Sequence, residues 1–264
     1  MWNNKNVLIT GGASGIGKLM GELFLKKGAN LIIWDIDEVG LDACIQEFKS
    51  IGTVRGYVVD LSRLSSIEKA AREVLLDFQR IDVLINNAGI VVGKYFHEHT
   101  NEDIAKTMAI NANAPMFTTL QFINSMMDHN CGFICNITSS AGLTSNPKMS
   151  AYVASKWAAT GWSDSLRIEM KKLDKNIHVT TVTPYYINTG MFDGVKSGMV
   201  PILDPNKVAT KIVRGIENQK IYVSMPWGFH FVRFMQGLLP VKWFDFIVGD
   251  VMGIYKSMDE FKGR

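Results

Sequence analysis

The stretch Thr10-Gly11-Gly12-Ala13-Ser14-Gly15-Ile16-Gly17 decides the fold, because it joins a short apolar run, Val7 to Ile9, to a helical pattern that reaches Lys27. Glycines let the backbone turn tightly and approach a pyrophosphate, and the N–H groups of a helix N-terminus favour its negative charge. A glycine-rich turn alone is a weak signal, but this one stands between a strand and a helix, as phosphate binding requires. We therefore predict that a dinucleotide binds here, at Gly11, Ser14, Gly15, Ile16 and Gly17.

Working outward, apolar runs alternate with helical patterns along most of the chain. Six further strands are expected, at 31–34, 54–59, 82–85, 133–137, 179–182 and 221–224. Helices are expected near 38–50, 65–79, 101–128, 151–173 and 205–218. Strands that are apolar on both faces and alternate with helices are typical of a parallel sheet covered on both sides. The pattern predicts an α/β Rossmann-type, doubly wound fold with a seven-stranded parallel sheet.

We expect one domain with two parts. Residues 1–225 form the dinucleotide-binding catalytic core, including a substrate loop at about 185–204, and residues 226–264 form a C-terminal aromatic helical extension. Of the chain's 27 aromatic residues, nine fall between Ile221 and Tyr255. The segment 227–255 is predicted to be two short helices broken at Pro240. Three roles stay open for it: peripheral contact with a membrane surface, a cover over the substrate cleft, or burial in a partner subunit.

Composition excludes several classes of protein. In 264 residues, 47% are hydrophobic, 20% are charged and the net charge is +3, which excludes a disordered chain. The charges are dispersed, so no nucleic-acid partner is expected. Three cysteines without a metal-ligand spacing predict neither a disulfide framework nor a metal site. We expect no signal peptide or transmembrane helix, and a cytoplasmic location with membrane association as the alternative.

Polar residues at the ends of the strands refine the prediction of the cofactor. Asp35 ends the second strand, where its carboxylate would accept hydrogen bonds from ribose hydroxyls and repel a 2′-phosphate. No arginine stands beside it to hold such a phosphate, so we expect NAD(H) rather than NADP(H). The alternative is that Asp35 only caps a helix, as Asp37 also could.

The ends of the third and fourth strands supply further candidate contacts. Asp60 could accept a hydrogen bond from the adenine amino group or merely cap the next helix, and Leu61 follows it. At Asn86-Asn87-Ala88-Gly89, small residues allow a cofactor to lie against the strand end, and asparagine side chains can brace neighbouring strands. We predict cofactor contacts at Asn87, Ala88 and Gly89.

Tyr152 and Lys156 are four residues apart and share one face of a long predicted helix. A cation beside a phenol favours phenolate, so we expect Lys156 to lower the pKa of Tyr152 toward neutral pH. This spacing alone is common on solvated helices. Here Ser139 ends the fifth strand 13 residues earlier, and Asn111 lies in the preceding helix.

Together these residues resemble the classical short-chain dehydrogenase/reductase family. The matching features are the glycine turn, Asn86-Asn87-Ala88-Gly89, Asn111, Ser139 and Tyr152-Val153-Ala154-Ser155-Lys156, in the family's order and spacing. The resemblance implies that Tyr152 is the general acid or base, Ser139 binds the substrate oxygen, Lys156 holds the nicotinamide ribose, and Asn111 positions a proton-relay water. Tyr152 and Lys156 would thus also contact the cofactor.

One departure from the family's pattern follows the sixth strand. Tyr185 stands in Pro184-Tyr185-Tyr186-Ile187-Asn188-Thr189 where the family commonly has glycine, which leaves the detailed backbone of this loop in doubt. Pro184, Ile187 and Thr189 still match cofactor-contacting positions near the nicotinamide. The loop 194–201 is a candidate lid, lined by Met191, Phe192, Val195, Met199 and Val200, although these residues could simply pack the domain.

The stretch 188–192 and the tail 256–264 resemble the retinol and 17β-hydroxysteroid branch of the family, the tail being similar to the ending of epidermal retinol dehydrogenase-type proteins. The resemblance implies an NAD(H)-dependent alcohol–carbonyl oxidoreductase with a retinoid, steroid or long-chain alcohol as substrate, assembled as a homodimer or homotetramer. The alternatives are an NADPH-dependent 3-oxoacyl-carrier-protein reductase and a catalytically silent NAD-binding scaffold.

Overall fold

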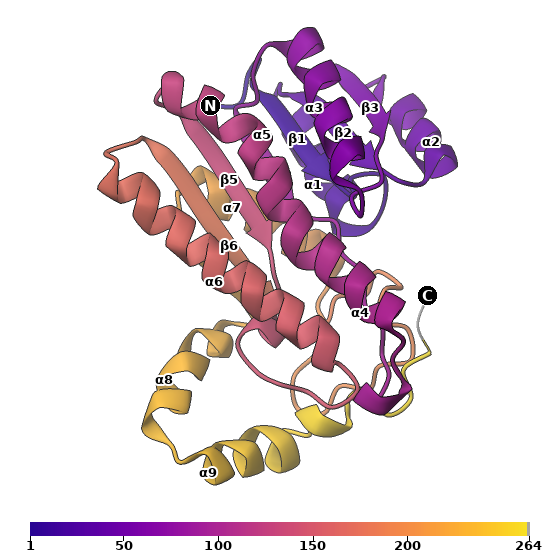
Figure 1. The fold of residues 1–264 in the computed structure, drawn as a ribbon, viewed down its shortest axis with the longest axis vertical. Coiled ribbons are helices and arrows are strands. Elements are labelled where there is room, and N and C mark those ends of the chain that lie inside the picture. The colour runs from indigo at the N-terminus through magenta and orange to yellow at the C-terminus, as the bar shows by residue number, and fades with distance from the viewer. Residues whose placement is uncertain (263–264) are drawn as a thin grey trace.

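The computed structural model describes residues 1–262, and its centre is a seven-stranded sheet (Figure 1). The strands are all parallel and lie in the order β3-β2-β1-β4-β5-β6-β7. The predicted doubly wound α/β fold is therefore confirmed. The bounds are β1 Asn6–Thr10, β2 Asn30–Asp35, β3 Val54–Val58, β4 Val83–Asn86, β5 Gly132–Ile137, β6 Ile177–Pro184 and β7 Tyr222–Met225.

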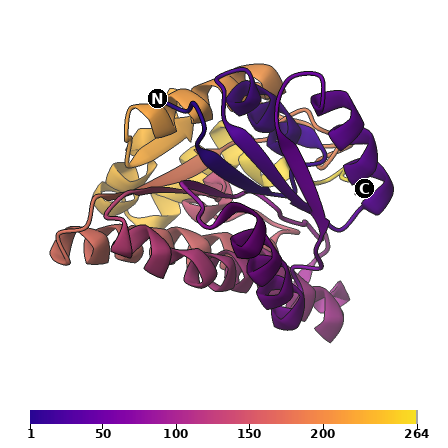
Figure 2. The same cartoon turned by 90° about the horizontal axis from the view of Figure 1, so that it is seen from above.

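Helices cover both faces of this sheet (Figure 2). One face carries α1 Gly15–Leu25, α2 Glu38–Phe48 and α7 Pro205–Glu217; the other carries α3 Leu64–Phe78, α5 Ala114–Asp128 and α6 Ser150–Lys172. Successive side chains of a strand point to opposite faces. Accordingly Val7 and Ile9 pack in the first apolar core and Leu8 in the second, and all three are fully buried. This explains why the strands are continuously apolar.

The predicted helix at 101–128 is not a single α-helix. It consists of α4 Asn101–Met108, a π-helical turn at Ala109–Asn113 and α5. Pro115 supplies the physical reason, since it has no N–H to donate to the carbonyl of Asn111 four residues earlier. Such π turns are frequent at functional sites. This one carries Asn111.

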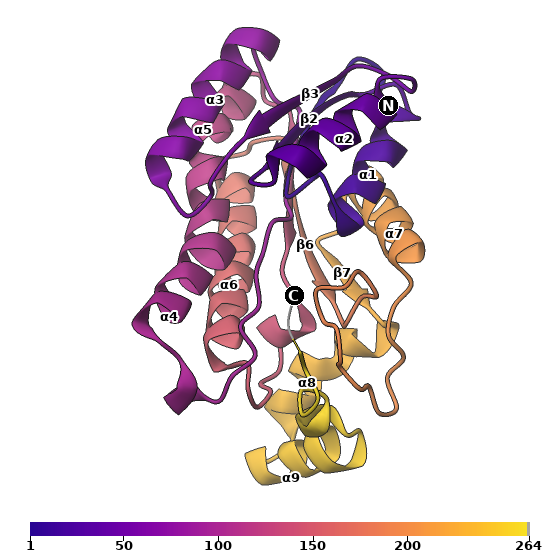
Figure 3. The same cartoon turned by 90° about the vertical axis from the view of Figure 1, so that its right-hand side faces the viewer.

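The C-terminal extension contains α8 Val232–Leu238 and α9 Val241–Asp245, with Pro240 between them as expected. A 3₁₀ turn at Trp227–Phe231 precedes them, and a π turn at Phe246–Val251 and a 3₁₀ turn at Ile254–Lys256 follow. Figures 1 and 3 show α8 and α9 beyond the main body of the molecule. Within residues 1–262, no helix combines the length and the apolar character needed to cross a membrane. Gly263 and Arg264 of the tail motif lie outside the described residues.

Candidate active site

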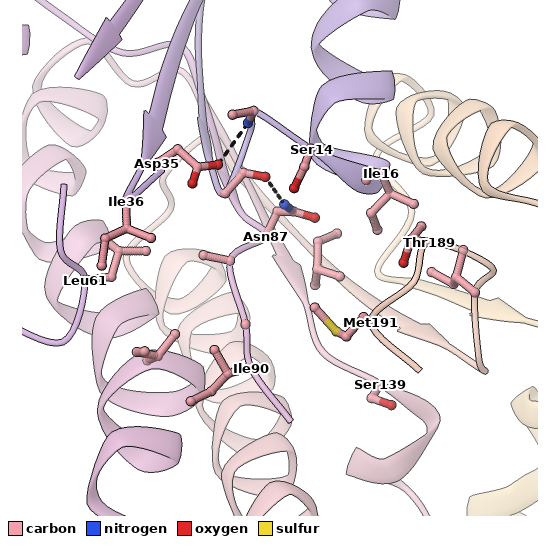
Figure 4. Close-up of a pocket in the computed structure, with 18 of the residues that line it drawn as sticks. Ser14, Ile16, Asp35, Ile36, Leu61, Asn87, Ile90, Ser139, Thr189 and Met191 are labelled. Atoms are coloured by element: carbon pink, nitrogen blue, oxygen red, sulfur yellow. Dashed lines mark hydrogen bonds between the residues drawn. The ribbon is translucent and has the colours of Figure 1, made fainter. Parts of the chain in front are cut away.

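A cavity of about 400 Å³ opens at the carboxyl edge of the sheet, where the order of strands reverses between β1 and β4 (Figure 4). Ligands of open α/β sheets bind at such a reversal. The cavity collects nearly all of the predicted site residues. Those that line it are Gly11, Ser14, Gly15, Ile16, Asp35, Asp60, Leu61, Asn87, Ala88, Gly89, Ser139, Tyr152, Lys156, Pro184, Ile187 and Thr189.

The glycine turn has the backbone that the sequence requires. Gly11 and Gly15 adopt positive φ angles of +61° and +54°, which favour glycine. A Cβ at Gly17 would overlap the carbonyl oxygen of Gly11 and lie 2.6 Å from Asn87 Nδ2. Asn87 Nδ2 donates to the carbonyl oxygen of Gly11 at 3.0 Å (Figure 4) and to that of Thr10 at 2.9 Å. The fourth strand end therefore holds the turn in shape before any ligand arrives.

The two acidic residues at the end of β2, Asp35 within the strand and Asp37 after it, have different roles. Asp37 is the N-cap of α2, and its side chain accepts from the backbone N–H of Gly40 at 3.1 Å. Asp35 instead faces the cavity and accepts from the backbone N–H of Ala13 at 3.0 Å (Figure 4). It also accepts from the backbone N–H of Asp37 at 3.2 Å. Asp35 therefore ties the glycine turn to β2 and presents a carboxylate at the rim.

Asp60 shapes the turn before α3 but is not the cap of that helix, because its N-cap is Arg63; contact with an adenine stays a prediction. Asp60 Oδ1 accepts from the Ser62 hydroxyl at 2.6 Å and from the Ser62 backbone N–H at 3.0 Å, which shapes the turn. The Ser62 hydroxyl bond is the largest cause of a lowered pKa of this carboxyl, with Arg63 adding to it. Asp60 also lines the cavity next to Leu61.

Tyr152 and Lys156 lie on the face of α6 that is turned into the molecule, and each is only 4% exposed. Lys156 Nζ is 5.7 Å from the centre of the Tyr152 ring and donates to the carbonyl oxygen of Ile137 at 3.1 Å. Ser139 Oγ accepts from the N–H of Ala141 at 3.1 Å, which fixes the hydroxyl at the end of β5. The predicted proximity of these three side chains is therefore observed.

The prediction that Lys156 lowers the pKa of the Tyr152 phenol is wrong. Burial raises the pKa of this phenol to about 12, and the neighbouring Ser139 hydroxyl offsets only part of the rise. Burial also lowers the pKa of Lys156 to about 8. Removal of the charged form from water is the largest cause of both pKa shifts, in place of the charge effect expected from the sequence.

Asn111 does not line the cavity. Its Nδ2 donates to the carbonyl oxygen of Ile90 at 2.9 Å and to Ser155 Oγ at 3.1 Å, while its Oδ1 accepts from the N–H of Ile90 at 2.8 Å. Both amide hydrogens are therefore used to hold the segment after β4 against α6. The Asn111 side chain is therefore a brace, and the water-positioning role that the resemblance implies for this residue stays a prediction.

The substrate side of the cavity agrees with the sequence only in part. Met191 and Phe192 line the cavity, but Val195 and Val200 are buried in a third apolar cluster and Met199 is 64% exposed. Tyr185, which stands in place of the family's glycine, is buried with its ring 5.6 Å from that of Phe229 in the C-terminal extension. The extension thus accounts for a large residue at this position.

Several lining residues were missed from the sequence, namely Ile36, Val59, Ile90, Ile110, Ile137 and Thr138. They are mostly apolar residues next to a strand end or to a predicted site residue. The sequence could have indicated them only by their place at or near the carboxyl ends of predicted strands, because these ends meet at one edge of a parallel sheet. Within residues 1–262, no three His, Cys, Asp or Glu side chains gather closely enough to bind a metal ion.

Comparisons with known proteins agree with this geometry. Residues 5–199 match the model of the family described as short chain dehydrogenase. The chain is 35% identical to human epidermal retinol dehydrogenase 2 over 97% of its own length and 84% of that protein. It is 32% identical to human estradiol 17-beta-dehydrogenase 11 over 89% of its own length and 79% of that protein.

Two solved structures show a similar fold. A short-chain dehydrogenase/reductase from Burkholderia phymatum, solved in complex with NAD, superposes with a TM-score of 0.82 at 23% identity and covers 89% of this chain and 94% of its own. A short-chain dehydrogenase from Sphingobium yanoikuyae, solved in complex with NADPH, gives 0.77 at 26% identity and covers 89% and 92%.

Proposed function

Because this chain belongs to the short-chain dehydrogenase family, we propose that it is an NAD(H)-dependent oxidoreductase that interconverts an alcohol and a carbonyl on a lipophilic substrate. The observation that carries the proposal is that Tyr152, Lys156 and Ser139 line the same cavity as the glycine turn. A buried acid–base group therefore lies within one continuous space with a phosphate-binding turn. This argues against the alternative of a catalytically silent scaffold.

The residues present fit a nicotinamide dinucleotide. Gly17, which does not itself line the cavity, lets α1 pack directly against the Gly11 carbonyl and the Asn87 amide, and the N–H groups at the start of α1 suit a pyrophosphate. The substrate loop lies opposite, with Thr189 next to Gly15. When bound, the cofactor would accept or supply a hydride. Lys156 and Tyr152 would hold its nicotinamide half.

The preference for NAD(H) rests on Asp35. Its carboxylate stands at the rim of the cavity beside the apolar Ile36, and of the residues that line this cavity only the distant Lys156 is basic. A 2′-phosphate at this rim would meet an uncompensated negative charge. The solved relatives carry NAD in one case and NADPH in another. The argument for this chain therefore comes from its own carboxylate.

The protonation of the site suits proton transfer to a carbonyl oxygen. With a pKa of about 12, the Tyr152 phenol is protonated at neutral pH and can donate to that oxygen. The Ser139 hydroxyl, held at the end of β5, can hydrogen-bond the same oxygen. With a pKa of about 8, Lys156 is charged at pH 7 and stabilises the phenolate that remains. In the oxidation direction, the phenol would first have to release its own proton, and the resulting phenolate would then take the proton of the alcohol.

A lipophilic substrate is supported by the walls near Tyr152. Ile90, Met191, Phe192 and Tyr185 line this end of the cavity, and apolar walls with few polar groups suit apolar ligands. The names of the two human relatives point to a retinol and a steroid alcohol. We infer that a retinoid, steroid or long-chain alcohol binds here.

The exposed side of the C-terminal extension supports peripheral membrane contact. Phe229, Phe244 and Val248 are buried in the cluster around Tyr152, so one side of the segment covers the active site. The outward side bears cationic Lys242 together with large exposed apolar residues, whereas Arg233 turns back toward Tyr222 and Asp164. The exposed apolar residues are Trp227, Phe231, Phe234, Leu238, Val241, Trp243, Phe246 and Val251. Tryptophan and cationic side chains together are typical of a membrane interface.

Initial rates test the proposed activity. The purified protein is given NAD⁺ or NADP⁺ with retinol, a steroid alcohol, a long-chain alcohol and a small diol, and absorbance of the reduced cofactor is followed. We expect turnover of a lipophilic alcohol and a higher kcat/KM with NAD⁺. A higher value with NADP⁺ would overturn the cofactor assignment, whereas tight NADH binding without turnover of any alcohol would favour the silent scaffold.

A further inference from the structure

We propose that Ser257, Met258 and Phe261, near the C-terminal end of the chain, are positioning residues of the active site. They hold Tyr186 and Phe192 against Tyr152 and so set the size of substrate that reaches the catalytic phenol. The inference rests on the proposed function for the nature of the substrate. The contacts that support it stand independently of that function.

In residues 257–262, here called the tail, three side chains turn into the molecule, while Asp259, Glu260 and Lys262 are exposed. Ser257 and Met258 are each 1% exposed, and Phe261 is half-buried. Ordering a segment without regular secondary structure costs conformational entropy. Specific contacts must therefore hold the tail in place.

A buried polar cluster joins the tail to two loops at the active site. Ser257 Oγ lies 2.9 Å from Tyr186 Oη, and Asn146 Nδ2 donates to both oxygens at 3.0 Å. Ser257 Oγ itself donates to the carbonyl oxygen of Ile254 at 2.7 Å. Loss of one member would remove a buried hydrogen bond from each of the other two, which is costly.

The tail also holds the loop that carries Phe192. The N–H of Lys196 donates to the carbonyl oxygen of Ser257 at 3.2 Å, and the N–H of Lys262 donates to that of Asp193 at 3.1 Å. Between these two bonds, Gly194 has a φ of +81°, and a Cβ there would overlap the carbonyl oxygen of Glu260. The loop is therefore fastened to the tail immediately after Phe192.

Apolar contacts extend the tail to a third loop, the segment after β4. A Cβ at Gly93 would overlap the ring of Phe261 and lie 3.0 Å from the Met258 methyl group. Glycine at position 93 thus permits close packing of both tail side chains. Three loops near the substrate end of the cavity therefore contact the tail: the loop with Asn146, the loop with Tyr186 and Phe192, and the segment after β4.

A chain of aromatic contacts connects the tail to the catalytic phenol. The Tyr186 ring lies 4.9 Å from the Phe192 ring, and Phe192 lies 6.2 Å from the Tyr152 ring, both in edge-on geometry. Because Ser257 fixes Tyr186 and the tail backbone fixes the loop after Phe192, release of the tail should let Phe192 move away from Tyr152. The cavity would then widen on the substrate side.

Hydrogen exchange of Ser257→Ala, Tyr186→Phe and their double variant tests the contacts without requiring turnover. We expect amide exchange in 193–197 to accelerate at least tenfold, while β1 and the glycine turn exchange as before. Lys256→Ala, an exposed neighbour of Ser257, is the matched control and should change neither region. Unchanged exchange in 193–197 of the variants would overturn the proposal.

Kinetics of the same variants test the effect on specificity. On the alcohols that the wild-type protein oxidises, the KM ratio between the smallest and the bulkiest should change at least fivefold, with NADH affinity kept within twofold. The double variant should change this ratio no more than Ser257→Ala alone, because both hydroxyls act through one contact. Equal changes in KM for all alcohols, or fully additive effects, would contradict a positioning role. Absence of turnover in the wild type would count against the proposed function alone.

Discussion

At the scale of single residues, Lys156 brings an ammonium group into a site where it is 4% exposed and where its pKa falls from 10.5 to about 8. Between these two values the unfolded chain binds the proton and the folded protein does not. Stability therefore rises with pH across this window, by the linkage between proton binding and folding. Below pH 8 the folded protein carries the full cost of a buried charge.

Substitution Lys156→Met should reveal this cost. The neutral side chain removes the charged form, so the variant should gain stability relative to wild type at pH 7, and lose most of that advantage at pH 10. Between pH 7 and pH 10, the difference in free energy of unfolding between the variant and the wild type should change by about 2 kcal/mol. Urea unfolding at both pH values measures it. A difference that does not depend on pH would contradict the burial-driven shift.

The charge of Asp35, rather than its hydrogen bonds, should set the choice of cofactor. Asp35→Asn keeps an oxygen that can accept from the N–H of Ala13 but removes the negative charge. We expect kcat/KM with NADP⁺ to rise about tenfold relative to that with NAD⁺, equivalent to about 1.4 kcal/mol. Steady-state kinetics with both cofactors measures the ratio. An unchanged ratio would show that Asp35 does not discriminate.

At the scale of elements, the glycine turn works because it has no side chain where α1 meets the end of β4. Gly17→Ala would place a methyl group against the carbonyl oxygen of Gly11 and the amide of Asn87. We expect NADH affinity to fall at least tenfold, as measured by fluorescence titration.

Gly161→Ala provides the control for that substitution. Gly161 lies in α6, where a Cβ would meet no atom within 4 Å. The change should leave NADH affinity unaltered and stabilise the helix by about 1 kcal/mol. Equal loss of affinity in both variants would mean that the turn has no special role.

The same elements show which parts of the molecule follow from local sequence. The strands were predictable because the runs at 31–34 and 82–85 are apolar on both faces, and the glycine turn because its spacing follows from ligand geometry. The π turn at Ala109–Asn113 was missed, since a helical pattern looks continuous through Pro115. Local sequence also gave no sign that desolvation would outweigh the charge of Lys156 at Tyr152.

Contacts between segments that are distant in the sequence could not be predicted either, because local sequence does not show which segments pack together. Ser257 meets Tyr186 across 71 positions of the chain and Asn146 across 111. Each is an ordinary polar residue in its own neighbourhood, and only the packed fold gives the three a common partner. The large side chain of Tyr185 is likewise explained only by the fold, which places Phe229 beside it.

At the scale of the whole molecule, the outward side of the C-terminal extension should bind membranes. Vesicles of phosphatidylcholine and phosphatidylserine at low salt should carry the protein upward in a flotation gradient. Replacing Trp227 and Trp243, which are 68% and 65% exposed, with alanine should reduce the floated fraction at least tenfold. Trp157→Ala, at a 46% exposed tryptophan on α6, is the control and should float like wild type.

Two other outcomes of that experiment are informative. No lipid-dependent movement of the wild-type protein would contradict membrane contact. If sedimentation velocity then showed a dimer that the double tryptophan variant cannot form, the exposed surface would instead be a contact between copies of this chain.

The most direct measurement of the central claim compares wild-type protein with Tyr152→Phe in an NADH absorbance assay. The substitution removes only the phenolic hydroxyl, so NADH binding by fluorescence titration should be unchanged. Because general acid–base catalysis contributes roughly 10²–10⁴-fold, turnover of the preferred lipophilic alcohol should fall by at least 10². Near-wild-type turnover in Tyr152→Phe would contradict the assignment of Tyr152 as the acid–base group.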